Sequence, residues 1–392
     1  MDHGPLRWST GDGTTATTHV DLHECLLPDS NDSSAYRVDG PSLGQRWPQT
    51  LLTMLAVAGI TIMLFASPNT TTPSLPSTRL EVDVLLSAQT SANFNVDQDD
   101  VPNSSRGPSV APPTFEKIMA AIDDVNYNQG LLPIPLGSPY GISGDLLNPG
   151  QPNVVVALGD SHLDFTKPRF VKLFQDASNA STFPTMVFKV AMGTSVLQCA
   201  HNFVANLDMI LRVKPQVAFV SFYWWTYIRP DGAATDLLHH PLPCCSNYWH
   251  QPCQFQSQRD AVELVRNFQA HMTRLTAAGI RVFVAGVNVD GMEYHPSNMV
   301  SGGDVGVVDP VSRAAFEAKR AFIIGLVEPA VAAAGATLIN FSDNMCDGDI
   351  CQVVDPDGVP IMKDDNHFTA SFVRTYLSVV DQVAAAGMAP LE

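Results

Sequence analysis

Short apolar runs alternate with amphipathic stretches along the second half of the chain. The runs are rich in β-branched and aromatic residues, which is typical of strands buried on both faces of a parallel sheet. We predict strands at 154–158, 185–190, 217–223, 281–285 and 337–341. Helical periodicity predicts helices at about 167–176, 259–278, 311–334 and 369–386. Because helical crossovers cover both faces of a parallel sheet, the pattern predicts a three-layer α/β/α domain.

The hydrophobic pattern also predicts where the folded domain begins. Apolar residues have helical spacing from Phe115 to Ile122, so we expect the domain to span 113–392. Residues 67–112 are rich in Pro, Ser and Thr without periodicity, which is typical of an extended stalk. Residues 1–46 are mostly polar, and we expect a disordered cytosolic tail there.

Between the tail and the stalk lies an apolar stretch, 47–66, without a charged residue. A helix needs about 20 apolar residues to cross a bilayer, so we predict a single transmembrane helix here. A cleavable signal peptide is one alternative, but the polar segment before the stretch is too long for the start of such a peptide. A buried core helix is the other alternative, and the disordered character of the flanks disfavours it.

Charge and cysteine positions indicate which side of the membrane the domain faces. Arg37 and Arg46 precede the span and Arg79 follows it, a weak bias toward a cytosolic N-terminus. Cys25 precedes the span and the other six cysteines follow it, which indicates an oxidising compartment. We therefore expect a type II membrane protein with its domain in the secretory pathway, for example the Golgi, or at the cell surface. Glycosylation sequons agree with this location: Asn69, Asn103, Asn179 and Asn340.

The cysteines after the span suggest disulfides rather than a metal site. Cys346 and Cys351 can close a tight loop. Pairing among the others stays open: Cys199, Cys244, Cys245 and Cys253. The segment from His239 to Cys253 combines histidines with cysteines, but its spacings match no zinc pattern. We expect a disulfide-tied loop over the active site, with no metal and no cofactor.

Composition narrows the possible partners. The chain carries 22 Lys+Arg against 39 Asp+Glu, a formal net charge of -17. This acidic balance disfavours nucleic acid as a partner, because nucleic-acid binding needs basic patches. The hydrophobic content of 45% is sufficient for a packed core.

Candidate chemistry begins at the end of the first predicted strand, where Gly159, Asp160, Ser161 and His162 follow one another. Open α/β sheets bind ligands at the carboxyl ends of their strands. A serine hydroxyl there becomes a strong nucleophile once a base takes its proton. The alternative interpretation makes Ser161 the N-cap of the next helix.

A matching base and its orienting group lie near the end of the chain. His367 follows Asp364 by three residues, just before the last predicted helix. One imidazole nitrogen can accept the serine proton while the other donates to the carboxylate, in the arrangement of a Ser-His-Asp triad. Asp365 is the rival for the orienting role, and the alternative for both acidic residues is capping of the last helix.

Gly-Asp-Ser near the start of the domain and Asp-x-x-His near its end resemble the SGNH hydrolase superfamily of esterases and acyltransferases. The resemblance implies a flavodoxin-like three-layer fold and makes Gly193, after the second strand, a candidate oxyanion donor. An ordinary turn glycine is the alternative. The Gly-x-Asn block expected after the third strand is absent, and Asn288 is an amide in a different segment.

The residues in place of that block point to a narrower family. Trp225-Thr226-Tyr227, the Cys346–Cys351 pair and the segment 364–369 are similar to SGNH domains fused to acyltransferase-3 membrane proteins. The match covers about 115–390. Such proteins place O-acyl groups, usually acetyl, on surface polysaccharides. Trp225 and Tyr227 are candidates for sugar stacking, with core packing as the alternative.

The resemblance implies O-acyl ester chemistry on a glycan, in a membrane-anchored O-acyltransferase or carboxylic-ester hydrolase. The triad serves both activities, so a deacetylating esterase is one alternative. A catalytically inactive glycan-binding module is another, because the third block departs from the pattern. Since the multi-span acyltransferase domain has no counterpart here, a separate multi-span protein is the expected acyl donor.

Overall fold

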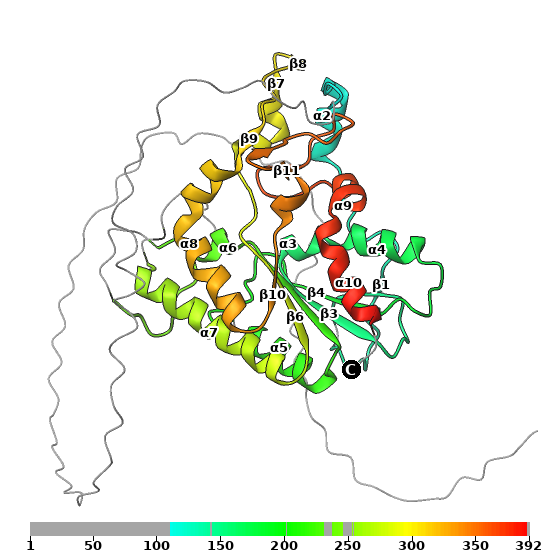
Figure 1. Ribbon diagram of the computed structural model, residues 1–392, viewed down its shortest axis with the longest axis vertical. Helices are drawn as coiled ribbons and strands as arrows, with labels where there is room; N and C mark the ends of the chain where they lie inside the picture. The colour runs from blue at the N-terminus through cyan, green and yellow to red at the C-terminus, as the bar shows by residue number, and fades with distance from the viewer. Residues whose placement is uncertain are drawn as a thin grey trace, which may run out of the picture. The chain divides into compact units, whose positions relative to one another are not determined.

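In the computed structural model, the described part of the chain forms a seven-stranded sheet (Figure 1). Its strand order is β1-β2-β4-β3-β5-β6-β10. The structure describes residues 110–141, 143–200, 202–230, 237–245, 253 and 255–389. The strands of the sheet are β1 (Leu132–Pro133), β2 (Asp145–Leu147), β3 (Val154–Gly159), β4 (Thr185–Val190), β5 (Val217–Ser221), β6 (Arg281–Ala285) and β10 (Thr337–Ile339).

The central five strands are parallel, as the hydrophobic runs predict. β3 pairs with β4 on one side and with β5 on the other, and β6 and β10 extend the sheet beyond β5. Val155, Val156 and Ala157 of β3 have no exposed surface, because helices cover both faces of the sheet. After β4 the chain crosses over β3, so that β5 lies on the other side of β3. The carboxyl end of β3 therefore lies beside a point where strand order reverses.

Although the sequence predicts a wholly parallel sheet, the strands beyond β4 are antiparallel. β2 pairs with β4 in the antiparallel sense, and β1 pairs with β2 likewise. These strands are too short for the hydrophobic pattern to reveal. The predicted strand 217–223 also ends early, at Ser221, because the backbone then turns so that the N–H of Tyr223 donates to Asp160 Oδ2 at 3.0 Å.

Two layers of helices enclose the sheet (Figure 1). One layer contains α4 (Lys167–Asp176), α9 (Ala370–Tyr376) and α10 (Asp381–Met388), and the other contains α5 (Asn202–Val213), α7 (Gln258–Ala277) and α8 (Arg313–Ala333). The sequence pattern does not predict α5. The helix expected at 369–386 is two helices, because the chain leaves helical geometry at Leu377 and forms the 3-10 helix η5 (Ser378–Val380).

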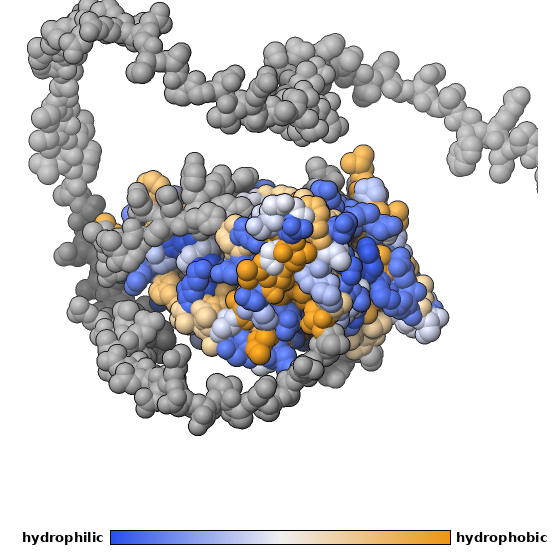
Figure 2. Space-filling model, turned by 90° about the horizontal axis from the view of Figure 1, so that it is seen from above, coloured by the Kyte–Doolittle hydropathy of each residue, from blue (hydrophilic) through white to orange (hydrophobic). Residues whose placement is uncertain are grey.

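Short elements complete the carboxyl end of the sheet. The helices are α3 (Ser161–Asp164), α6 (Trp224–Tyr227), η2 (Met292–Tyr294), η3 (Pro296–Met299) and η4 (Phe341–Asn344). The strands are β7 (Val300–Ser301), β8 (Asp304–Val305), β9 (Val311–Ser312), β11 (Cys346–Asp347) and β12 (Ile350–Cys351). We expected a helix at 311–334, but its first two residues form β9 and pair with β12. The helix α8 therefore begins only at Arg313. Seen from above, this face has hydrophobic residues gathered between hydrophilic ones (Figure 2).

The domain begins close to the predicted position. α2 (Phe115–Ile122) is capped by Thr114, whose side chain accepts from the N–H of Lys117. The chain after α2 contacts the end of the sequence: Tyr127 donates its hydroxyl proton to the carbonyl of Phe368 at 2.6 Å. The backbone of Asp124 accepts from the N–H of Ala370 at 3.1 Å. The chain after α2 thus helps to hold the segment that carries His367.

Three disulfides tie the described loops. Cys346 pairs with Cys351, as the sequence predicts, across the β11–β12 ladder. The open connectivity is resolved as Cys199–Cys244 and Cys245–Cys253, with Cα–Cα distances of 5.5 and 5.8 Å.

The predicted tail, membrane span and most of the stalk lie outside the described residues, together with Cys25, Asn69 and Asn103. Of the helices that the structure does describe, none combines the length and the apolarity needed to cross a bilayer. The transmembrane helix at 47–66 therefore stays a prediction.

Candidate active site

Ser161 lies at the carboxyl end of β3, in a turn that Gly159 makes possible. A Cβ at Gly159 would lie 1.7 Å from the backbone oxygen of Ser221 on the neighbouring strand. Asp160 then caps α3, accepting from the N–H of His162 at 2.7 Å. The turn presents Ser161 as a half-buried side chain at the start of α3. The N-cap role therefore belongs to Asp160 and not to the serine.

Ser161, His367 and Asp364 form a continuous hydrogen-bonded line. The Nε2 atom of His367 lies 2.8 Å from Ser161 Oγ. Its Nδ1 atom lies 2.9 and 3.0 Å from the two carboxylate oxygens of Asp364. The His367 side chain is 15% exposed and that of Asp364 is 25% exposed, so the line is partly accessible from solvent. With Nδ1–H donating to the carboxylate, Nε2 carries the lone pair that a base needs.

Asp364 is held in its charged form. Burial would raise its pKa, but hydrogen bonds from His367 and Lys363 outweigh burial and depress the pKa far below the usual range. Lys363 Nζ lies 2.6 Å from Oδ2, and the backbone N–H of Asn366 donates to Oδ1 at 3.0 Å. The rival, Asp365, instead accepts from Asn366 Nδ2 at 2.8 Å. The structure thus places Asp364, and not Asp365, against the imidazole.

Asp160 is a buried residue next to Ser161. Its Oδ2 atom accepts from the N–H of Tyr223 at 3.0 Å and from the hydroxyl of Tyr227 at 3.1 Å. Burial raises the pKa of Asp160 to about 6, while these hydrogen bonds and the nearby His367 act in the opposite direction. Tyr227 is only 4% exposed, so the core-packing interpretation describes its position.

The folded domain matches a known protein family. Residues 136–382, more than half of the chain, match the family described as SGNH domain (fused to AT3 domains). The chain belongs to this family. The domain is accordingly an enzyme of ester chemistry, an esterase or an acyltransferase.

Solved structures include similar chains at low identity, and no curated protein matches. The periplasmic domain of a lipopolysaccharide acetyltransferase from Salmonella ser. Paratyphi A is 10% identical, with a TM-score of 0.43. The match covers 68% of this chain and 98% of that one. A GDSL-like lipase from Bacteroides thetaiotaomicron is 11% identical, with a TM-score of 0.33 and coverage of 60% and 91%.

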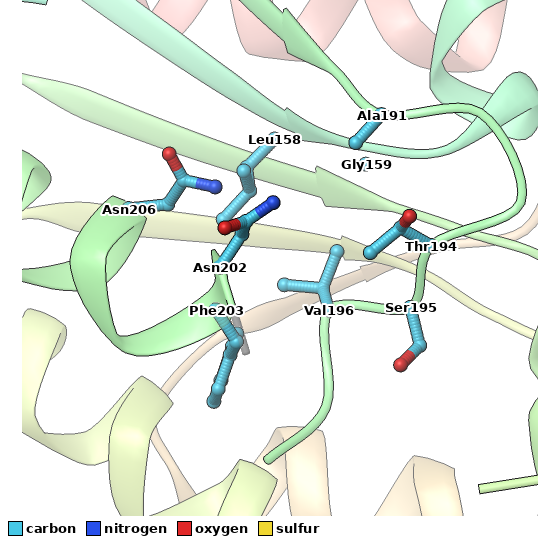
Figure 3. Close-up of a pocket in the computed structure, with 9 residues that line it drawn as sticks. All are labelled: Leu158, Gly159, Ala191, Thr194, Ser195, Val196, Asn202, Phe203 and Asn206. Atoms are coloured by element: carbon cyan, nitrogen blue, oxygen red, sulfur yellow. The ribbon is translucent and has the colours of Figure 1, made fainter. Parts of the chain in front are cut away.

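The turn of the SGNH domain that carries Gly193 lies beside the Ser161 turn. The N–H of Ala191 donates to the carbonyl of Gly159 at 2.9 Å, which joins the ends of β4 and β3. Gly193 is exposed and has φ +64°, a conformation that favours glycine. A small pocket lies between this turn and α5 (Figure 3). It is lined by Leu158, Gly159, Ala191, Thr194, Ser195, Val196, Asn202, Phe203 and Asn206. The oxyanion role of Gly193 stays a prediction.

The segment that replaces the third block places its aromatic rings in two environments. Trp225 is half-buried, and the guanidinium carbon of Arg320 lies 3.7 Å from the centre of its ring. Tyr223 is buried and stacks on the ring of His162, with centroids 4.5 Å apart and planes 11° apart. Asn288 is 4% exposed, and its Oδ1 has no hydrogen-bond partner among the described residues.

The described residues of the histidine–cysteine segment are held by a hydrogen bond and by disulfides. His239 Nδ1 lies 2.6 Å from Asp260 Oδ2, at the start of α7. Cys244, Cys245 and Cys253 are in disulfides. Over the described part of the chain there is no group of three or more His, Cys, Asp or Glu residues able to hold a metal ion.

Several residues that support the site are not predicted from the sequence. Asp290 accepts from the Tyr223 hydroxyl and from Arg320, and neither contact leaves a local signal in the sequence. Asn366 offers such a signal, because it stands inside the Asp-x-x-His motif and is buried.

Proposed function

We propose that this SGNH domain transfers or hydrolyses O-acyl esters, chiefly O-acetyl esters, of glycans. Ser161 is the nucleophile, His367 the general base and Asp364 the residue that orients the imidazole. The observation that carries the proposal is the 2.8 Å contact between Ser161 Oγ and His367 Nε2, with Asp364 on the opposite nitrogen. That line is what nucleophilic catalysis by serine requires.

The reaction proceeds in two halves. His367 Nε2 takes the proton as Ser161 Oγ bonds to the acyl carbonyl carbon, and a negative charge develops on the carbonyl oxygen. The tetrahedral intermediate collapses to an acyl-serine, and the imidazolium gives its proton to the departing oxygen. In the second half His367 takes a proton from a sugar hydroxyl or a water molecule, whose oxygen bonds to the acyl carbon. The bond from that carbon to Ser161 Oγ then breaks, and the imidazolium returns its proton to Oγ. Asp364 stays ionised throughout and stabilises the imidazolium, which its depressed pKa favours.

Backbone N–H groups would stabilise the oxyanion. The N–H of Ser161 and that of Gly193 are the proposed donors, because their turns are joined by the hydrogen bond from Ala191 to Gly159. Trp225 is the proposed sugar-stacking surface, with Arg320 fixing the orientation of the indole ring. Family relationship supports the glycan as substrate and an acyltransferase-3 membrane protein as the source of the acyl group.

The test uses the purified full chain in detergent, with p-nitrophenyl acetate as substrate and a fluorophosphonate as serine probe. We expect Ser161→Ala to abolish labelling, and Ser161→Ala and His367→Ala each to lower acetate release by about 10³-fold or more. Ser178→Ala, at an exposed serine outside the Asn179 sequon, is the matched control and should behave as wild type. A folded wild-type chain that neither labels nor releases acetate contradicts the proposal.

The same experiment addresses a second candidate function. The absence of the third-block Gly-x-Asn favours a glycan-binding module without catalysis. An inert but folded chain that still binds acetylated polysaccharide would support that function. For an active chain, acetyl transferred to an added polysaccharide, measured against acetate released to water, separates transferase from esterase.

A further inference from the structure

Behind Ser161 and His367 a closed set of contacts joins the ends of three strands to the loop that carries the base. We call it the support ring, and it consists of His162, Tyr223, Asp290, Gly291, Asp365 and Asn366. His162 follows β3, Tyr223 follows β5, and Asp290 and Gly291 follow β6. The ring therefore spans segments that are distant in the sequence but adjacent at the carboxyl edge of the sheet.

One half of the ring connects β6 to the nucleophile turn. Arg320 Nη2 donates to Asp290 Oδ1 at 2.7 Å, and the Tyr223 hydroxyl donates to Asp290 Oδ2 at 2.6 Å. The ring of Tyr223 then stacks on His162. All four side chains are at least nine-tenths buried, so the tyrosine ring is fixed at its hydroxyl end and gives His162 a rigid surface.

The other half connects His162 to the loop of His367. His162 Nε2 lies 3.4 Å from Asn366 Oδ1, and Asn366 Nδ2 donates to Asp365 Oδ1 at 2.8 Å. The carbonyl of Asp365 accepts from the N–H of Gly291 at 2.8 Å, which closes the ring beside Asp290. Because a carboxylate accepts and does not donate, Asn366 must turn its amide N–H toward Asp365 and its oxygen toward His162. The proton on His162 therefore lies on Nε2.

His162 is also kept neutral. Burial lowers its pKa well below 6.5, and the nearby His367 acts in the same direction. The ring centroids of the two histidines are 5.2 Å apart. When His367 becomes positive during the reaction, a second positive imidazole at this distance would oppose it. Other charged groups close to His162 are Asp160, which caps its backbone N–H, and Asp364.

We propose that His162 is a positioning residue: as a neutral Nε2–H donor to Asn366, it holds the His367 loop in register with Ser161. The inference rests on the proposed function, because it assigns His162 a role in the same reaction. His162 is covalently next to the nucleophile, and Asn366 is covalently next to the base. One hydrogen bond between them thus fixes the separation of the two reacting groups, which the tyrosine stack keeps from shifting.

The test compares two substitutions in the full chain. His162→Phe keeps an aromatic ring against Tyr223 and removes the donor, whereas His162→Gln keeps an N–H donor at a similar reach and removes the ring. We expect His162→Phe to lower kcat for p-nitrophenyl acetate by about 10- to 100-fold, since small misplacements of reacting groups cost this much. KM should change by less than about threefold, and His162→Gln should recover most of kcat and of the fluorophosphonate labelling rate.

Controls separate positioning from folding and from failure of the proposed function. Leu275→Ala removes buried side-chain volume near the end of α7, in the helix layer opposite α4 and α9, and should lower Tm with little change in kcat. The positioning role is overturned if His162→Phe is as active as wild type, or if the Phe and Gln variants lose activity equally. In either case an inactive Ser161→Ala leaves the proposed function standing. The pH profile of kcat/KM gives a further test. If the wild type shows an ionisation on the acid side that is missing in His162→Gln, then His162 itself titrates, and the positioning role is overturned. Full activity in Ser161→Ala would instead refute the proposed function itself.

Discussion

Asp364 and Asp365 are adjacent and chemically identical, yet their surroundings give them different tasks. Asp364 accepts from His367 and Lys363, so its charge faces the base. Asp365 accepts from Asn366 and is joined to the chain after β6 through its carbonyl. A single step along the backbone therefore separates the residue that orients the imidazole from one that shapes the loop.

This difference predicts unequal effects of the same substitution. We expect Asp364→Asn to lower kcat/KM by about 10²- to 10⁴-fold, because a neutral amide no longer stabilises the imidazolium and can favour the wrong tautomer. Asp365→Asn keeps the triad intact and should cost less than about tenfold, with ester hydrolysis as the measurement. A larger loss from Asp365→Asn would reverse the assignment.

The charge of Asp364 also predicts a pH effect on stability. Its pKa is depressed in the folded state, so its contribution to stability is present above its ordinary pKa of 3.8 and is lost as pH falls below it. We expect the wild-type Tm to fall on acidification from about pH 5 to about pH 3, and to fall less in Asp364→Asn. Parallel Tm curves for the two chains, measured by circular dichroism, would contradict this expectation.

At the scale of elements, the junction of β3 with α3 controls the position of Ser161. The strand pairs on both sides, so its last residue has no freedom to move away from β5. Gly159 is required there by close approach, since a Cβ would meet both Ser221 and Leu163. The glycine before Asp160-Ser161 is thus explained by backbone packing as well as by the turn.

Replacement of that glycine should destabilise the whole domain. We expect Gly159→Ala to cost about 3 kcal/mol, as overpacking of a rigid core does, and to lower Tm by about 10 °C. Gly325→Ala is the matched control, because Gly325 is exposed in α8 with nothing within 4 Å of the added Cβ. The control should be neutral or stabilising by about 1 kcal/mol. Equal Tm values for the two variants would show that β5 yields to the added methyl group.

At the scale of the whole molecule, the fold brings together residues from the two ends of the domain. Ser161 follows the first parallel strand, and His367 precedes α9, which packs on α4. Contacts of the chain after α2 with Phe368 and Ala370 hold the same loop from the N-terminal side. The contact between Ser161 and His367 therefore depends on the packing of α9 on α4 and on the chain after α2, not on local sequence alone.

The predicted membrane span gives a further expectation for the full chain. If 47–66 anchors the protein, the chain should sediment with membranes and resist alkaline carbonate, whereas a variant lacking 47–66 should be released. Ser161→Ala serves as the control and should sediment like wild type. Recovery of the full chain in the soluble fraction would contradict the anchor.

By itself, the sequence determined the parallel strands and the Cys346–Cys351 pair, and it predicted Ser161 and His367 as partners, whose side chains the structure places 2.8 Å apart. These features are encoded locally, in apolar runs, in short motifs and in close spacing. Tertiary structure alone decided the choice of Asp364 over Asp365, the pairing of Cys199 with Cys244, and the ring that joins His162 to Asn366. The reason is physical: which carboxylate faces an imidazole, or which sulfur meets another, depends on how distant segments dock at one edge of the sheet. No periodicity along the chain records that arrangement.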